Sequence, residues 1–475
     1  MSSHEIEKSS TTPGLPLSLS FSALIKDAHI KRYHRTLDRR SLIICLLCMA
    51  LGAFVSPIAY GLIMLIGIIT NFAFYGKFST NFISPANSPL HYSIVLVPVI
   101  GSLIVGLMAR FGSKAIRGHG IPEAMEQILT NESRIPIRMT FLKPLSAAVA
   151  IGTGGPFGAE GPIIATGGAL GSLLGQRIHV SAQERKVLLA AGAAAGMTAI
   201  FGTPFSAILL AIELLVFEFR PRSFIPITIA TLTTIYLRPL FFGNTQVIHV
   251  PLLSFISENE LLAYSLEGLV MGLLSVGITR STYMIEDVFE KLPLHWMWWP
   301  VLGGLVVGLI GLVSPHTMGV GYDNIERILD GHFLGSALLT FCTLKFLSWS
   351  IALGSGTSGG TLAPIFTIGG GLGVLIGQSL AFIGIPLDLH MAGLVGMAAC
   401  FAGASRALFT SILFSLEITN QLSPLVPLMA GCVTAYIVSA ILMRTTIMTE
   451  KLARRGTHVP SEYIAATPPS GKNPK

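Results

Sequence analysis

Residues 152–176 read GTGGPFGAEGPIIATGGALGSLLGQ, and residues 354–378 read GSGTSGGTLAPIFTIGGGLGVLIGQ. The positions differ by 354 − 152 = 202, and at that offset most of the glycines, one proline and the final glutamine recur. The same offset also holds upstream, from residue 98 onward. Short Gly-rich stretches match by chance, but chance would not hold one offset from residue 98 to residue 176. The sequence therefore predicts an internal repeat.

The repeat continues downstream with a small change of register. An offset of 204 pairs Glu213 with Glu417, which suggests a structural role for these two carboxylates. We therefore expect two homologous halves, roughly 41–240 and 255–445. Whether the halves are parallel or inverted depends on the number of crossings in each, and several short segments prevent that count.

The composition places most of the chain in lipid. Hydrophobic residues make up 51% of it and charged residues 12%, with a mean hydropathy of +0.69. A soluble domain would carry about a quarter charged residues. Fifty glycines and 27 prolines interrupt the apolar runs. Broken helices survive in lipid where protein or an aqueous cavity satisfies their backbone, so this pattern favours a transporter or channel over an anchor. The predicted apolar segments are 41–72, 91–109, 139–153, 186–217, 223–241, 259–279, 297–314, 335–353, 364–384, 389–419 and 422–443.

The net charge of +7 is concentrated around the two ends of the apolar region. Basic residues precede the first segment and follow the last, which predicts cytoplasmic termini and an even number of crossings. We expect a cytoplasmic segment over 1–40, a transport domain over 41–445 and a cytoplasmic tail over 446–475. The polar start of the chain predicts no cleavable signal peptide. Basic residues that flank membrane segments do not indicate nucleic-acid binding.

The five cysteines lie inside apolar runs and predict plain packing. Cys45 and Cys48 are spaced as CxxC, but no second pair or nearby histidine completes a metal site. The twelve histidines are scattered, and no nucleophile–base grouping stands out. We therefore expect neither an enzyme nor a metal or organic cofactor.

Three stretches punctuated by glycine and proline interrupt the apolar pattern. They are GHGIP at 118–122, GAEGP at 158–162 and GTLAP at 360–364. In each, proline followed by helix-forming residues is typical of a first helical turn. Helix N-termini present unpaired N–H groups and the positive end of the helix dipole. If these N-termini converge within the membrane, they form an anion site of partial charges, which lets an anion both bind and leave.

Glu160 lies inside the second of these stretches. A carboxylate within a membrane segment is costly and is by default a functional candidate. At a helix N-terminus it would be stabilised by the amides that also bind anions, so it could compete with the substrate as a tethered anion and vacate the site when protonated. The alternative to this gating role is that Glu160 only caps the N-terminus of its own helix.

In this order and spacing, GxGIP, GxEGP and Gx(x)AP resemble the CLC family of chloride channels and proton-coupled chloride antiporters. The resemblance covers about residues 40 to 455 and includes Lys143 and the closing KLARRG at 451–456. It implies an all-α polytopic membrane protein of two inverted-topology repeats with many tilted and broken helices. It also implies a homodimer in the inner membrane with one pore per subunit, and Glu160 as the external gating glutamate. The implied anion-binding residues are His119, Gly120, Ile121, Gly161, Thr361, Leu362, Ala363 and Met448.

Three positions depart from the family pattern. His119 replaces a serine whose hydroxyl donates to the anion, and Met448 takes the place of a tyrosine. Leu214 occupies the place of the inner glutamate of antiporters. Glu218 lies four residues further on, on the same helical face, but is not a strong candidate to replace that glutamate. His119 could donate an N–H or add a pH-dependent charge. It could also be a neutral side chain turned to the vestibule.

These departures leave three hypotheses. The first, slightly favoured, is an anion channel gated by Glu160, with chloride as the default ion and the lipid bilayer as its surroundings. The second is a proton-coupled antiporter for chloride or fluoride, since fluoride-exporting relatives also lack the inner glutamate. The third is a membrane sensor with a degraded pore, which the intact Glu160 and glycines disfavour.

Overall fold

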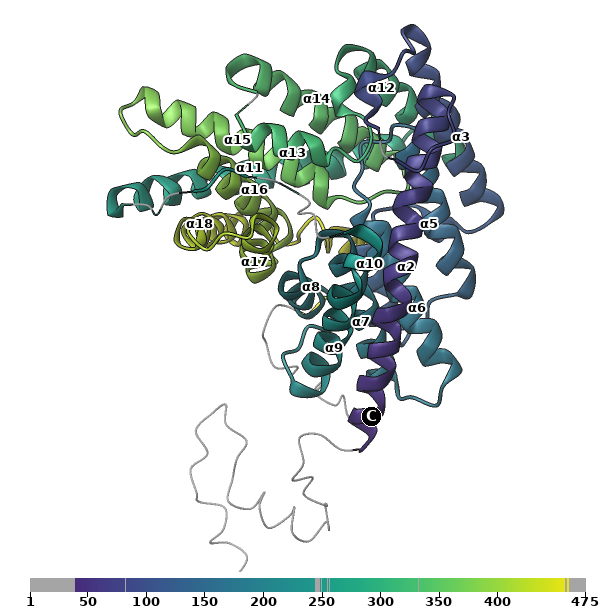
Figure 1. Cartoon of the computed structure of the whole chain (residues 1–475). Helices are drawn as coiled ribbons and strands as arrows, with labels where there is room; N and C mark the ends of the chain where they lie inside the picture. Colours follow the sequence, from purple (N-terminus) through teal and green to yellow (C-terminus); the bar gives the residue numbers. More distant parts are fainter. Residues whose placement is uncertain are drawn as a thin grey trace, which may run out of the picture.

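We analysed the chain in a computed structural model, which describes residues 39–460 except 82, 244–247, 249, 254, 256, 332 and 458. Of the expected terminal segments, 1–40 lies almost entirely outside this description, and 446–475 is described only as far as residue 460. The described residues form helices and contain no β-strand, only two isolated bridges (Figure 1).

The helices fall into two series. The first comprises α2 (Arg39–Tyr75), α3 (Leu96–Phe111), α4 (Ile121–Thr130), α5 (Ile137–Gly152), α6 (Glu160–Arg177), α7 (Ala182–Phe201), α8 (Pro204–Leu210), the π-helical turn η5 (Ala211–Val216), α9 (Pro221–Leu237) and α10 (Pro239–Phe242). The second comprises α11 (Glu258–Glu290), α12 (Trp299–Val313), α13 (Tyr322–Leu329), α14 (Gly335–Gly354), α15 (Leu362–Phe382), α16 (Leu389–Ser405), α17 (Leu408–Thr419), α18 (Leu425–Leu442) and α19 (Glu450–Arg454).

These series are the two inverted-topology repeats. Seven helices of the first, from α3 to α9, recur at the predicted offsets as α12 to α18. The halves pack directly against each other through α3 with α12 and through α8 with α17. Within each half, the closest packing is between α6 and α7 and between α15 and α16. Glycines allow this approach: a Cβ on Gly167 of α6 would lie 2.1 Å from the backbone oxygen of Gly192 of α7.

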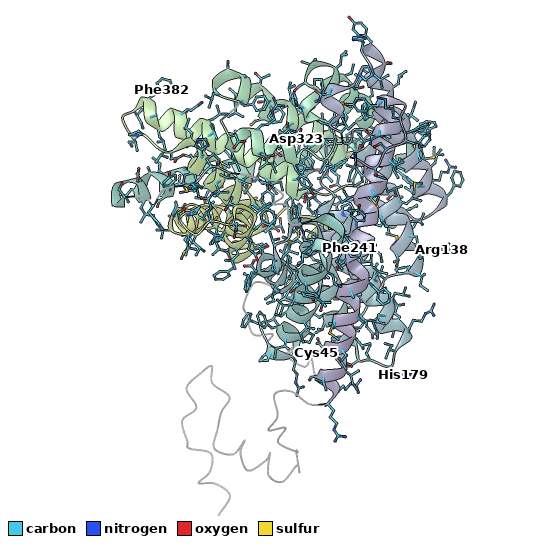
Figure 2. All side chains as sticks on the ribbon, viewed as in Figure 1. Cys45, Arg138, His179, Phe241, Asp323 and Phe382 are labelled. Carbon is cyan, nitrogen blue, oxygen red and sulfur yellow. The ribbon has the colours of Figure 1, made fainter. Side chains whose placement is uncertain are left out.

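The protein is an integral membrane protein. Eight of the described helices are long and apolar enough to cross a bilayer, judged by length and composition. Large apolar side chains cover the outside: Phe382, at the end of α15, is 93% exposed and projects from the molecule (Figure 2). The interior is packed with alanine and glycine, especially along α7 and α16. The five cysteines are all buried and free, as expected for packing residues.

Three predicted segments differ from the observed helices, and helix α6 lies outside all of the predicted segments. Segments 186–217 and 389–419 are each interrupted where a residue adopts a left-handed conformation, at Gly202 (φ 71°) and Arg406 (φ 61°). Segment 259–279 extends to Glu290, because its polar end continues the helix. Helix α6 was absent from the predicted segments: its glycines and polar residues lower the hydropathy, and protein rather than lipid surrounds it.

Glu213 and Glu417 form reciprocal helix caps between the halves. Glu213 accepts the backbone N–H groups of Phe409 and Thr410 at the start of α17, at 3.0 and 2.9 Å. Glu417 accepts those of Phe205 and Ser206 at the start of α8, at 2.8 and 2.7 Å. A carboxylate at a helix N-terminus satisfies amides that the helix leaves unpaired. This exchange explains the repeat-matched pair and joins α8 to α17.

Candidate anion site

The three Gly/Pro stretches meet inside the protein. Gly158 and Gly360 exchange backbone hydrogen bonds of 3.3 and 3.0 Å. Gly118 donates to the Thr357 carbonyl and accepts from the Gly359 N–H, both at 3.4 Å. The three stretches therefore converge, as predicted. The bridge between Gly118 and Ser358 joins residues that are 358 − 118 = 240 positions apart in sequence.

Each of the three stretches ends in a helix N-terminus. Helix α4 begins at Ile121, α6 at Glu160 and α15 at Leu362, so all three motif prolines lie in first turns, as predicted. In α6 the first intrahelical bond comes from the Ile163 N–H, and in α15 from the Ile365 N–H. Because proline precedes both, two amide N–H groups remain at each helix start. They are those of Glu160 and Gly161 in α6, and of Leu362 and Ala363 in α15.

The N-terminus of α4 is arranged differently. The Gly120 N–H donates to Glu123 Oε2 at 2.6 Å, so this amide is already occupied, and Lys451 Nζ donates to Glu123 Oε1 at 3.1 Å. The Ile121 amide remains as the α4 donor nearest the convergence. Lys143 Nζ donates to the Ile116 and Gly118 carbonyls, both at 2.7 Å, and thereby fixes the approach to this helix.

Glu160 is 0% exposed and lies where the stretches meet. Its Oε1 accepts the hydroxyl of Tyr322 at 2.6 Å. Its Oε2 has no hydrogen-bond partner of good geometry among the described residues, although the backbone N–H of Ala363 faces the carboxylate. The carboxylate therefore occupies space beside the α15 amides that a free anion would use. The carboxylate thus faces the N-terminus of α15 as well as the start of its own helix, α6.

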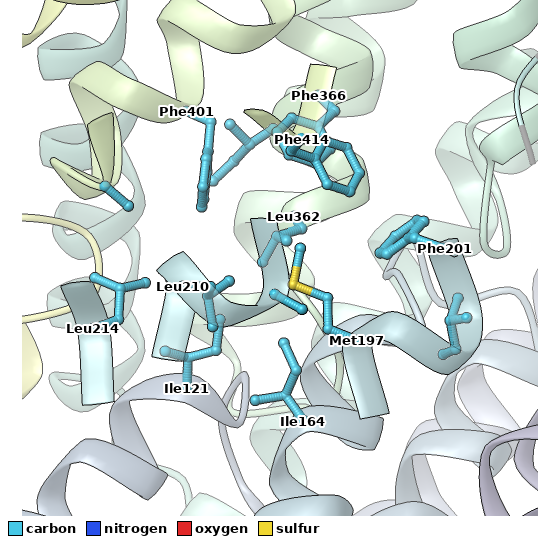
Figure 3. Packing of buried hydrophobic residues seen from close by; sticks show 14 of the residues in the cluster. Ile121, Ile164, Met197, Phe201, Leu210, Leu214, Leu362, Phe366, Phe401 and Phe414 are labelled. Carbon is cyan, nitrogen blue, oxygen red and sulfur yellow. The ribbon is translucent and has the colours of Figure 1, made fainter. Parts of the chain in front are cut away.

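Apolar side chains surround the convergence (Figure 3). Leu362 lies between Ile121 and Leu210 on one side and a group of phenylalanines on the other. Leu214, at the position of the inner glutamate of antiporters, is buried in this region. Thr361 is 1% exposed, and its hydroxyl has no partner among the described residues.

His119 and Met448, two of the three positions that depart from the family pattern, have separate surroundings. His119 is buried, and its Nδ1 has no described partner. It lines a cavity of about 470 Å³ together with Arg117, Lys143 and Trp296. Met448 is fully buried, and its N–H donates to the Thr446 hydroxyl at 3.2 Å.

A second cavity, of about 670 Å³, lies on the other side of α4. Met125 of α4 and Leu214 form part of its lining, as do the guanidinium-bearing residues Arg406 and Arg444. Fixed positive charges at a cavity raise the local concentration of anions. The two cavities have no lining residue in common, and the acidic residue Glu213 lines this one beside Leu214.

Tyr322 is the site residue that the sequence analysis missed. It is the first residue of α13, and no motif surrounds it. The repeat did hold a signal, at an offset of 201: the GxG of residues 319–321 matches the GxG of residues 118–120, which makes Tyr322 the counterpart of Ile121. Among the described residues, no group of three or more His, Cys, Asp or Glu side chains is arranged to hold a metal ion.

These features define a membrane protein whose inverted repeats bring helix N-termini and one carboxylate together in its interior. A family model described as voltage gated chloride channel matches residues 100–440. The chain belongs to this family, the CLC family, whose members transport anions.

Individual relatives agree with this assignment. The H(+)/Cl(-) exchange transporter ClcA of Yersinia pestis is 30% identical over 393 residues, or 77% of this chain and 80% of the relative. A putative chloride channel protein, ClcB-like, of Ralstonia nicotianae is 28% identical over 367 residues, or 76% and 85%.

Solved structures support the fold. The crystal structure of a slow cyanobacterial Cl⁻/H⁺ antiporter gives a TM-score of 0.77 at 21% identity, covering 88% of this chain and 98% of the other. A CLC-type fluoride/proton antiporter gives 0.70 at 20% identity, covering 84% and 95%.

Proposed function

We propose that the protein is an anion channel, with chloride as its default ion, and that Glu160 is its gate. The observation that carries the proposal is the position of the Glu160 carboxylate, which is fully buried and faces its own amide at the start of α6 and the Ala363 amide at the start of α15. A charged carboxylate there excludes a second anion by repulsion, and protonation removes the competing charge. His119, Gly120, Ile121, Gly161, Thr361, Leu362, Ala363 and Met448 are the proposed surroundings of the anion.

Leu214 supports passive conduction over coupled exchange. Strict proton coupling requires a group that passes the proton of Glu160 onward, and a leucine side chain cannot bind one. Its neighbours Ile121, Leu210 and Leu362 are also apolar (Figure 3). In this proposal a proton binds and leaves Glu160 from one side only, and the anion moves down its own gradient.

Proton-coupled exchange of chloride or fluoride is the second candidate. It is favoured by the names of the relatives, since an H(+)/Cl(-) exchange transporter and two antiporters resemble the chain. In either case we propose a homodimer with one pore per subunit, set in the lipid bilayer of the inner membrane with both termini cytoplasmic. We also propose that the flux depends on membrane voltage, and this part of the proposal rests on family membership alone.

Flux measurements in liposomes separate the two candidates. Purified protein should release chloride from loaded vesicles without moving protons against their gradient. Proton uptake driven by a chloride gradient, in fixed ratio to the chloride flux, would replace the channel proposal with the antiporter. A parallel series with fluoride identifies the anion. Vesicles that release neither anion between pH 4 and pH 8 would support a sensor.

Thr361→Val tests whether the unpartnered hydroxyl binds the anion. Valine has nearly the same shape, and the hydroxyl has no described partner to lose, so stability should stay within about 1 kcal/mol of wild type. The chloride concentration for half-maximal flux should rise several-fold, because a neutral hydrogen bond contributes about 1 kcal/mol. Thr203→Val is the matched control, since the Thr203 hydroxyl is likewise buried and without a described partner, but Thr203 is the N-cap of α8. An equal effect of both variants would contradict the role of Thr361.

A further inference from the structure

Tyr322 comes from the helix that corresponds to α4 in the second half. Helix α13 is the inverted mate of α4, and Gly120 and Gly321 are the matching N-cap residues, so Tyr322 takes the place of Ile121 at the first helical position. Gly321, at φ 77°, turns the chain into this helix. Where the first half has the apolar side chain of Ile121, the second half has a phenol that reaches Glu160 of the first. The two repeats therefore meet at the gate through one side-chain hydrogen bond.

The contact is short, and the ring is held in place. Tyr322 Oη lies 2.6 Å from Glu160 Oε1, within the range of hydrogen bonds to a charged oxygen. The Tyr322 ring packs edge-on against Phe201, at 5.6 Å between centroids. Phe201 in turn packs against Phe414 at 5.0 Å, and Phe414 stacks on Phe366 at 4.7 Å (Figure 3). A phenol fixed in this way donates from one position.

We propose that Tyr322 is a positioning residue that holds the charged Glu160 carboxylate in the anion site. This proposal rests on the gating role of Glu160 proposed above. A hydrogen bond to a carboxylate is about twice as strong as one to a neutral acid. The hydroxyl therefore favours the charged, blocking form, and protonation weakens its hold. Tyr322 thereby sets the pH at which the carboxylate leaves the site.

Other ionisable groups nearby are engaged elsewhere. Lys143 and Lys345 donate to backbone carbonyls. Glu123 of α4 accepts a hydrogen bond from Lys451. Helix α15, which packs against α6, carries no ionisable side chain, and α7 carries its charged residues in its first turns. The ionisable groups on the elements around the site, besides Glu160 and Tyr322, are His119, Glu123, Glu126, Arg138, Lys143, Arg177, Asp323, Glu326, Arg327 and Lys345.

Tyr322→Phe tests the proposal by removing one oxygen and keeping the ring. In liposomes loaded with chloride, the pH of half-maximal efflux should move upward by about one unit or more, because the charged carboxylate loses a donor. In a Glu160→Gln background the same substitution should leave the flux at every pH unchanged. Tyr283→Phe is the matched control: its hydroxyl donates to the Ile447 carbonyl at 2.7 Å, away from the gate, and its pH profile should match wild type.

The outcomes separate this inference from the gating proposal. A Tyr322→Phe profile equal to wild type, with a flat profile for Glu160→Gln, would overturn the role of Tyr322 and leave the gate standing. A pH-dependent Glu160→Gln variant would overturn the gate itself. If Tyr322→Phe does not fold, Phe201→Leu, which removes the support of the ring, should give a smaller upward shift. An unshifted profile in that variant would also overturn the proposal.

Discussion

Glu160→Gln should give a chloride flux that is high and nearly the same at every pH. Glutamine has the shape of the protonated glutamate but cannot acquire a charge. The wild-type flux should fall by up to tenfold for each pH unit once the carboxylate is mostly ionised, as expected for control by one proton. The variant should therefore exceed wild type by up to about tenfold for each pH unit above the pH at which the wild-type carboxylate is mostly ionised. Stopped-flow or electrode measurements on liposomes between pH 4 and pH 8 record both profiles.

Glu213→Gln is the matched control for this result. It makes the same carboxylate-to-amide change at a carboxylate that caps α17. Because the cap accepts backbone N–H groups, its loss should lower the melting temperature while the pH profile keeps its wild-type shape. A Glu160→Gln variant that retains the wild-type pH dependence would show that another group controls the flux.

The glycines and prolines made the fold and half of the site predictable. They recur at a fixed offset because close helix contacts and helix starts restrict the residue type at those positions. The starts of α4, α6 and α15 therefore follow from Pro122, Pro162 and Pro364. The inverted arrangement of the two halves could be predicted only from the family resemblance, because the number of membrane crossings in each half cannot be determined from the apolar pattern alone.

Other features depend on contacts that a local pattern does not encode. Helix α6 lacks the hydropathy of a membrane segment because protein surrounds it. The breaks at Gly202 and Arg406 occur in apolar sequence, and the arginine gives no turn signal. Tyr322 lies 322 − 160 = 162 residues from its acceptor, so only the three-dimensional arrangement pairs them. The occupied amide of Gly120 likewise depends on the rotamer of Glu123.

Gly161→Ala should abolish most of the anion flux. Gly161 is the second residue of α6, where the three stretches meet, and a Cβ there would lie 2.2 Å from the His119 carbonyl oxygen and 2.8 Å from the Gly360 Cα. Both are backbone atoms of the other two stretches, so no side-chain rotation relieves the contact. The loops must separate, which costs about 1–3 kcal/mol or more and displaces the amides from the anion.

Thermal unfolding in detergent and chloride efflux from liposomes measure the two consequences together. Gly277→Ala is the control, because a Cβ on this α11 glycine meets nothing within 4 Å. Alanine in an open helical position should raise stability by about 0.5–1 kcal/mol and leave the flux unchanged. A Gly161→Ala variant with wild-type melting temperature and flux would mean that the stretches do not meet at this residue. A lowered melting temperature with a matching loss of flux would tie anion passage to the contact of the three stretches, since every donor proposed for the anion lies at or beside it.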